Sequence, residues 1–245
     1  MTLFSDNFFV AIICITLYYT LKKKTKPEFI LWIFLLVIQV FARPPGVFLT
    51  AVFGCYYLYT SKILSATKVA ILAAISMTTL IGFLFYIPVE TKGYIKPIAA
   101  GCIIVDKPDY DIPKFNGLEK SSISEAYAYL IEQNGVSYTI HLYFSKLGSF
   151  FTLTRPYYSP LNNSILAVHY LLYVLAIAGM FIIRKKRALF FLFLSNMILI
   201  SNLTALTYNE WHYRFTLAIF PFIIVLSVIS VHYIKSAFSE KLRKK

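Results

Sequence analysis

A short polar stretch near the end of the chain carries the side chains best suited to chemistry. It reads NEWHYRF, from Asn209 to Phe215, and apolar runs of membrane length flank it on both sides. Arg214 could hold a phosphate, because a planar guanidinium bonds two phosphate oxygens at once and stays charged. Glu210 could orient Arg214 or His212, or act as an acid or base. The alternative is an interfacial anchor, in which the aromatic side chains lie at the membrane surface and Arg214 pairs with lipid headgroups.

Two further arginines lie at the borders of apolar runs. Arg43 is followed by two prolines, which break a helix and fix a turn between two runs. Arg155 lies in the stretch Thr154–Ser159, directly before another run. Together with Arg214, these arginines are expected to form an anion-binding pocket at one membrane surface. For Arg43, a hairpin turn whose arginine reaches the headgroups is the alternative.

Carboxylates that could act as a general acid or base lie on the same predicted side of the membrane. Asp6 is at the start of the first apolar run, and Asp106 is in the long polar segment. Asp109 and Asp111 have the acid-x-acid spacing that binds a divalent cation with a nucleotide-sugar, but the prolines around them favour an exposed turn. The four histidines and three cysteines have no metal-site spacing. No metal site is therefore predicted, and a divalent cation is kept only as an open alternative among the cofactors.

The composition is that of an integral membrane protein. Of the 245 residues, 58% are hydrophobic and only 14% are charged, whereas about a quarter of the residues in soluble domains are charged. The formal net charge is +13, but the basic residues gather in short patches beside the apolar runs. This pattern is typical of membrane topology and argues against nucleic-acid binding.

Seven apolar runs predict an all-α integral membrane protein with about seven transmembrane helices. A span needs about 20 mainly apolar residues. The second and third runs are shorter, so they are expected to be tilted spans or a hairpin that enters and returns. The expected spans are Leu3–Leu21, Phe29–Ala42, Gly46–Thr60, Val69–Val89, Ile165–Ile183, Leu189–Tyr208 and Phe215–Ile234.

The basic patches orient these spans. They follow the first, third, fifth and last runs, at residues 22–26, 62–68, 184–187 and 235–245. With seven spans all four patches lie on one side, which the positive-inside rule makes cytoplasmic. The prediction is therefore four spans in residues 1–89, an exported segment in residues 90–164, and three spans with a cytoplasmic basic tail in residues 165–245.

The exported segment is predicted to be mainly helical. Ser122 to Glu125 reads as a capping box, and Gly135 is expected to end the helix that begins there. A second helix is expected from Ser137 to Thr152, with apolar residues on one face and Lys146 off that face. It would lie on the membrane surface or pack within a small domain.

Three stretches, taken in order, resemble motifs of polytopic, lipid-dependent glycosyltransferases of the GT-C superfamily. The stretch Arg43–Leu49 resembles the RP-x-G segment that opens a span in these enzymes, and Arg155–Ser159 follows. Arg214–Phe222 resembles the C-terminal RY-x-x-P-x-x-P-F segment, with Phe215 in place of the tyrosine and Ala218 in place of the first proline. Members resemble protein O-mannosyltransferases and the aminoarabinose and bacterial cell-envelope sugar transferases.

The resemblance implies that a sugar moves from a polyprenyl-phosphate carrier to an acceptor on the outer face of a bacterial inner membrane. It also implies that this chain corresponds to the C-terminal portion of such an enzyme, because the family's catalytic acid usually lies in a first large outer loop upstream. The implied partners are membrane lipid, the polyprenyl-phosphate sugar and a second membrane subunit. The implied catalytic residues are Asp6, Asp106 and Glu210, and the implied lipid-phosphate ligands are Arg43, Arg155, Arg214 and His212.

Two other classes of function stay open. One is a non-catalytic polytopic partner that assembles with another membrane subunit or binds lipid carriers. The other is a transporter or channel, for which polar groups near mid-span are expected. Asn196, Ser201 and Asn202 in the sixth run are the only such groups, and residues of this kind commonly bond neighbouring helices.

Overall fold

The chain folds as a bundle of helices. The computed structural model describes residues 2–86, 89–90, 95–105, 120–207, 209–210 and 216–243. Four two-residue strands pair near one end: β1 (Val89–Glu90) with β3 (Lys120–Ser121), antiparallel, and β2 (Ile104–Val105) with β4 (Asn209–Glu210), parallel. The helices are α1 (Thr2–Leu21), α2 (Lys26–Ala42), α3 (Pro45–Thr60), α4 (Ala66–Tyr86), α5 (Lys96–Ala99), α6 (Ile123–Phe151), α7 (Pro160–Val168), α8 (Tyr170–Ile183), α9 (Arg187–Leu206), the 3-10 helix η2 (Thr216–Ala218) and α10 (Phe220–Arg243).

Each of the seven predicted apolar runs contributes a helix, which confirms a mainly helical protein with membrane-length segments. Four stretches of the described chain are long and apolar enough to cross a membrane: Ala66–Phe83, Pro160–Ile183, Arg187–Leu206 and Phe220–Ala237. α2 and α3 have 17 and 16 residues, short of the 20 or so that a straight span needs. Transmembrane helices are therefore supported at four places, and the count of seven stays a prediction.

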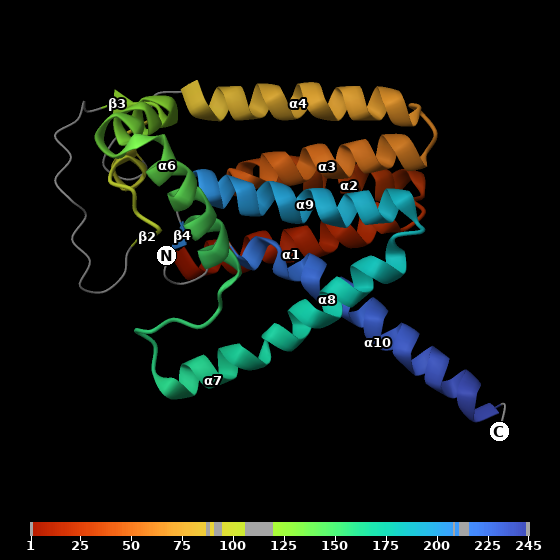
Figure 1. Cartoon of the computed structure of the whole chain (residues 1–245). Helices are drawn as coiled ribbons and strands as arrows, with labels where there is room; N and C mark the ends of the chain where they lie inside the picture. The colour runs from red at the N-terminus through yellow and green to blue at the C-terminus, as the bar shows by residue number, and fades with distance from the viewer. Residues whose placement is uncertain are drawn as a thin grey trace.

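The helices form two groups (Figure 1). α1, α2, α3, α4 and α9 run side by side, while α8 and α10 cross each other obliquely beside them. α6 lies across one end of the bundle, near the N-terminus, and the C-terminus lies far from it. We call this the α6 end. It gathers α6, the start of α1 and the end of α9.

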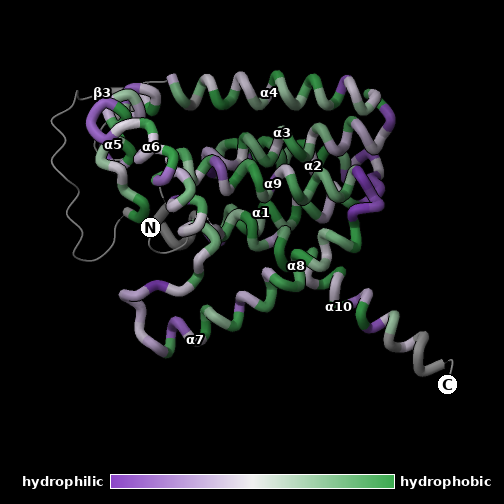
Figure 2. Tube along the Cα trace, in the orientation of Figure 1, coloured by the Kyte–Doolittle hydropathy of each residue, from purple (hydrophilic) through white to green (hydrophobic). Residues whose placement is uncertain are grey.

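The opposite end of the bundle is basic. The connections from α1 to α2, from α3 to α4 and from α8 to α9 all lie there (Figure 1), and Figure 2 shows polar residues concentrated at these turns. They contain Lys22–Lys26, Lys62 and Arg184–Lys186, with Arg187 beginning α9. We call this the basic end. Three of the four predicted basic patches thus share one end, as the positive-inside pattern requires.

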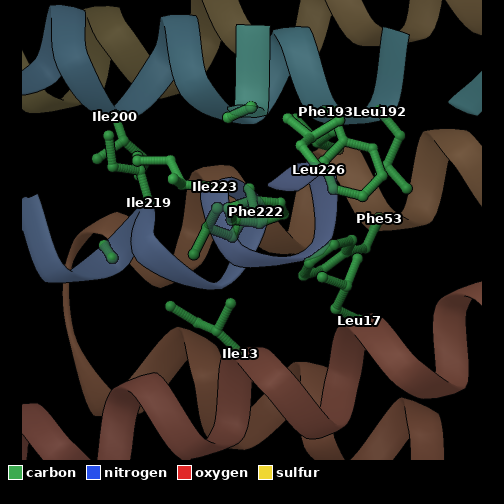
Figure 3. Close-up of a cluster of buried hydrophobic side chains, with 14 of the residues drawn as sticks. Ile13, Leu17, Phe53, Leu192, Phe193, Ile200, Ile219, Phe222, Ile223 and Leu226 are labelled. Carbon is green, nitrogen blue, oxygen red and sulfur yellow. The ribbon is translucent and has the colours of Figure 1, made fainter. Parts of the chain in front are cut away.

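The core joins α1, α3, α9 and α10 (Figure 3). Phe222 is fully buried, and its ring centroid lies 6.2 Å from that of Phe53 and 5.9 Å from that of Phe193. Ile13 of α1 is also fully buried in this cluster. Because lipid chains are as apolar as these side chains, close packing rather than escape from water holds such a core together in a membrane.

α8 and α10 approach each other especially closely. A Cβ placed on Gly179 would lie only 2.3 Å from the backbone oxygen of Leu226. Two hydroxyls of α10 donate hydrogen bonds across the contact, Ser227 to the Leu172 oxygen at 2.9 Å and Ser230 to the Leu175 oxygen at 2.6 Å. Small residues that allow such contact are typical of helix pairs in membranes.

The prediction of two helices in this segment is confirmed, but their buried face differs from the prediction. The capping box at Ser122 and Glu125 is present, and Gly135, with φ of 83°, interrupts the helix, so α6 consists of two helices joined at a kink. The buried stripe is not the predicted one. Leu142, Lys146 and Phe150 are buried at intervals of four, whereas Phe144 of the predicted apolar face is 62% exposed. The placement of Lys146 off the buried face was wrong, since α6 packs its 142–146–150 stripe inward.

Candidate functional site

An ion pair between Asp6 and Arg43 is the strongest chemical feature of the α6 end. Asp6 lies near the start of α1, and Arg43 caps the C-terminal end of α2 in an extended conformation. The Arg43 Nη2 contacts the Asp6 Oδ1, and the two side chains are only 16% and 6% exposed. Burying either charge without the other would cost roughly several kcal/mol. The attraction between the two side chains offsets this cost. The structure thus brings together two predicted site residues that lie on different helices.

The turn after Arg43 fixes the backbone of that residue. It is the helix-breaking turn that the prolines predicted. The Gly46 N–H donates to the Arg43 oxygen at 2.8 Å, and α3 begins at Pro45. Gly46 is required there, because a Cβ would lie 1.8 Å from the backbone oxygen of Gln39. Close contact between α2 and α3 therefore fixes the position from which Arg43 reaches Asp6.

Arg155 is buried in the connection between α6 and α7. Its Nη2 donates to the Ser149 oxygen at 2.8 Å. Its backbone N–H donates to the Asn163 Oδ1 at 2.9 Å, and the Asn163 Nδ2 donates back to the Arg155 oxygen at 2.7 Å. Arg155 is only 6% exposed. It is therefore part of a hydrogen-bonded connection against the last turn of α6, not a side chain extended toward headgroups.

The segment around NEWHYRF approaches the same end through its flanks. Thr216 of η2 donates to the Phe150 oxygen of α6 at 3.1 Å, and η2 packs against α1. In the parallel pair of β2 and β4, Val105 lies opposite Glu210. The predicted residues Asp106, His212 and Arg214, and the Asp109–Asp111 pair, lie outside the described residues, as does the side chain of Glu210.

Lys146 is a buried cation that sequence reasoning missed. It is fully buried, and its Nζ donates to the Thr207 oxygen at 2.6 Å, just beyond the end of α9. Burial lowers the pKa of Lys146 to about 8, against a smaller opposing effect from Cys102. The signal was its spacing of four residues from both Leu142 and Phe150, which places all three on one stripe of a helix.

Two tyrosines of α6 reinforce this contact with α9. The Tyr127 hydroxyl donates to the Leu206 oxygen at 2.9 Å, and the Tyr143 hydroxyl donates to the Asn202 Oδ1. Tyr127 and Lys146 thus satisfy backbone carbonyl groups at the C-terminal end of α9, where the helix leaves them without partners of its own, and Tyr143 binds the side chain of Asn202 one turn earlier. We call this set of contacts the α6–α9 junction. It positions the segment that leads into NEWHYRF.

The polar residues of the sixth predicted span have local roles. Asn196 donates to the Leu192 oxygen at 2.8 Å and Ser201 to the Ile198 oxygen at 3.1 Å, both within α9. Asn202 donates to the Ile198 oxygen at 2.7 Å and also accepts from Tyr143 of α6. In the part of the chain that the structure describes, no three His, Cys, Asp or Glu side chains gather as metal ligands would.

The buried lysine gives the junction a pH dependence. An unfolded lysine keeps its proton up to a pH near its ordinary pKa of 10.5, whereas buried Lys146 loses it above about 8. Because the unfolded state binds more protons between these values, the free energy of unfolding should rise as pH increases from 8 to 10.5, by ~3 kcal/mol in all. Thermal unfolding in detergent at pH 7.5 and 10 measures this. The increase in the free energy of unfolding should be absent in Lys146→Met and present in Lys185→Met, a control at an exposed lysine. An equal increase in both variants would show that Lys146 is not its cause.

No protein-family model matches the chain, and no curated protein or solved structure matches it. The resemblance to the GT-C superfamily therefore stays a prediction from the stretches around Arg43, Arg155 and Arg214.

Proposed function

We propose that the chain is a membrane glycosyltransferase, or the C-terminal portion of one, that uses a polyprenyl-phosphate sugar at the α6 end. The observation that carries the proposal is the buried Asp6–Arg43 pair. A carboxylate and a guanidinium in contact are the two groups that such a reaction needs. In this proposal the α6 end faces outward from a bacterial inner membrane, and the basic end and the C-terminus face the cytoplasm.

The reaction assigns one task to each member of the pair. The acceptor hydroxyl attacks the anomeric carbon of the sugar, the bond from that carbon to the phosphate oxygen breaks, and the polyprenyl phosphate leaves with the bonding electrons. Arg43 stabilises the negative charge that develops on the leaving phosphate. Asp6 takes the proton of the acceptor hydroxyl.

The ion pair itself supplies a way to couple binding to chemistry. Without ligand, Arg43 and Asp6 neutralise each other in the buried ion pair. A lipid phosphate that takes over Arg43 would release Asp6 to accept a proton. In this exchange Arg43 stays paired, first with Asp6 and then with the phosphate, and Asp6 becomes neutral when it accepts the proton.

Arg214 keeps the supporting role that the resemblance implies. It lies two residues before Thr216, which hydrogen-bonds to Phe150 at the end of α6. Arg155 follows the same helix end by four residues. In the proposal, Arg155, Arg214 and His212 keep the role of phosphate ligands that the resemblance implies, Glu210 supports them, and Asp106 is the second candidate for the base.

Binding of the carrier without its sugar tests the phosphate site. Polyprenyl phosphate and polyprenol have the same chain and differ in the headgroup, so the whole protein in nanodiscs should retain the phosphate and release the alcohol in native mass spectrometry. Arg214→Ala should weaken the retention of polyprenyl phosphate about tenfold or more, because one charge-assisted hydrogen bond to the phosphate is lost. The control Lys235→Ala, in the exposed part of α10, should bind as wild type. Equal retention of phosphate and alcohol by the wild-type protein would contradict the proposal.

A further inference from the structure

A cavity between α3, α4 and α9 lies toward the basic end of the bundle. Its volume is about 460 Å³, within the roughly 300–1000 Å³ of small-molecule sites. α4 contributes three alanines and one valine, Ala66, Val69, Ala70 and Ala73. The other walls are mostly aliphatic and aromatic side chains of α3 and α9, among them Val52 and Phe191. A cavity with these walls favours an apolar occupant over water.

The alanines explain why the cavity exists. Residues 66, 70 and 73 follow helical spacing and share one face of α4. None of the 18-residue apolar window Ala66–Phe83 is buried within the molecule. A methyl group is too short to fill the space between α4 and α9, so a groove remains that a lipid chain can enter from the side.

The end of this groove is positively charged. Arg187, the first residue of α9, lines it and is exposed, and the three residues before it, Arg184–Lys186, are also basic and exposed. Lys62 and Lys68 flank the turn at which α4 begins. No acidic side chain of the described ranges forms an ion pair with Arg187. An apolar groove that ends at an unneutralised arginine matches a molecule with an anionic head and an apolar chain.

We propose that this groove binds one acyl chain of an anionic phospholipid from the membrane leaflet at the basic end, with its phosphate on Arg187. The positive end of the α9 helix dipole adds to the attraction. This site lies at the opposite end of the bundle from Asp6 and Arg43, so it is separate from the proposed carrier site. Its occupant would fill the space between α4 and α9 and fix α4 against the bundle.

A second cavity offers a matched comparison. It lies between α1 and α10, has about the same volume, 470 Å³, and is lined by Leu17, Ile224 and other apolar residues. Its one cation, Lys22, already pairs with Glu28 at 2.5 Å. This cavity therefore lacks a free charge to select an anionic headgroup.

Lipid retention by the purified full chain tests the proposal. Phosphatidylglycerol and phosphatidylcholine with identical acyl chains are added in detergent, and bound lipid is counted by native mass spectrometry. The wild-type protein should retain one phosphatidylglycerol about tenfold more strongly than phosphatidylcholine. Arg187→Gln should reduce this preference about fivefold, because one basic residue near an anionic membrane surface contributes about 1 kcal/mol of binding free energy. Ala70→Phe should abolish retention by filling the groove. Ile224→Phe in the second cavity should leave it unchanged.

Three results would overturn the assignment: equal retention of the two lipids by wild type, full retention by Ala70→Phe, or an undiminished preference in Arg187→Gln. If Ala70→Phe does not fold, Ala73→Phe takes its place, since both alanines line the same wall. The double variant Asp6→Asn, Arg43→Gln, at the other end of the bundle, leaves no buried charge without a partner, so it should keep its fold and retain phosphatidylglycerol as wild type does. A loss there would assign the bound lipid to the carrier site instead.

Discussion

Replacing the buried ion pair by a neutral pair, Asp6→Asn with Arg43→Gln, is expected to keep the fold and abolish binding of polyprenyl phosphate. Each single substitution leaves the other charge buried without its partner, which should cost about 3–5 kcal/mol. The double variant leaves no charge and retains polar groups that can hydrogen-bond to each other, so its free energy of unfolding should return close to that of wild type. The double variant should still fail to bind polyprenyl phosphate, because the amide of glutamine has no positive charge.

Two measurements on four proteins separate structure from function at this pair. Thermal unfolding in detergent gives the stabilities of wild type, both single variants and the double variant, and native mass spectrometry gives retention of polyprenyl phosphate. A double variant that is stable and still binds the phosphate like wild type would show that Asp6 and Arg43 only hold α1 and α2 together. A stable double variant without binding supports the proposed role of Arg43.

Gly179→Ala is expected to be the most damaging small change in the bundle away from the site. The added Cβ would lie 2.3 Å from the Leu226 oxygen and 2.9 Å from its carbonyl carbon, and backbone atoms cannot move aside as a side chain can. α8 and α10 would have to separate, which would break the bonds from Ser227 and Ser230. We expect a loss of ~3 kcal/mol, at the upper end of overpacking effects.

Gly54→Ala is the matched control for this prediction. Gly54 also lies within an apolar helix, α3, but a Cβ there meets nothing within 4 Å. The control should gain up to about 1 kcal/mol from the higher helix propensity of alanine. Thermal unfolding of both variants in the same detergent measures the difference. If Gly179→Ala were as stable as Gly54→Ala, the close crossing of α8 and α10 would be wrong.

Features that depend on neighbouring residues were predictable from the sequence. The capping box at Ser122 rests on a side chain and a backbone N–H three residues apart, and it is present. The turn after Arg43 follows from two prolines, and α3 begins at the second of them. The apolar runs likewise become helices, because a chain in lipid must satisfy its backbone hydrogen bonds internally.

Features that depend on how helices cross were not predictable. Asp6 and Arg43 were each expected at the site, but their contact requires α1 and α2 to lie side by side with a particular rotation. Lys146 was assigned to the wrong face, because the inward face of α6 is chosen by α9 and by the carbonyl of Thr207, not by the apolar pattern of α6 alone.

Sugar transfer by the wild-type protein tests the central claim most directly. The whole chain is reconstituted in proteoliposomes with radiolabelled sugars on polyprenyl phosphate and with acceptors supplied on the face of the α6 end. The proposal predicts labelled acceptor together with released polyprenyl phosphate, in equal amounts, and none of either from the stable Asp6→Asn, Arg43→Gln double variant. Retention of the carrier with no transfer from any sugar would contradict the claim and leave a subunit that binds the lipid carrier without catalysis.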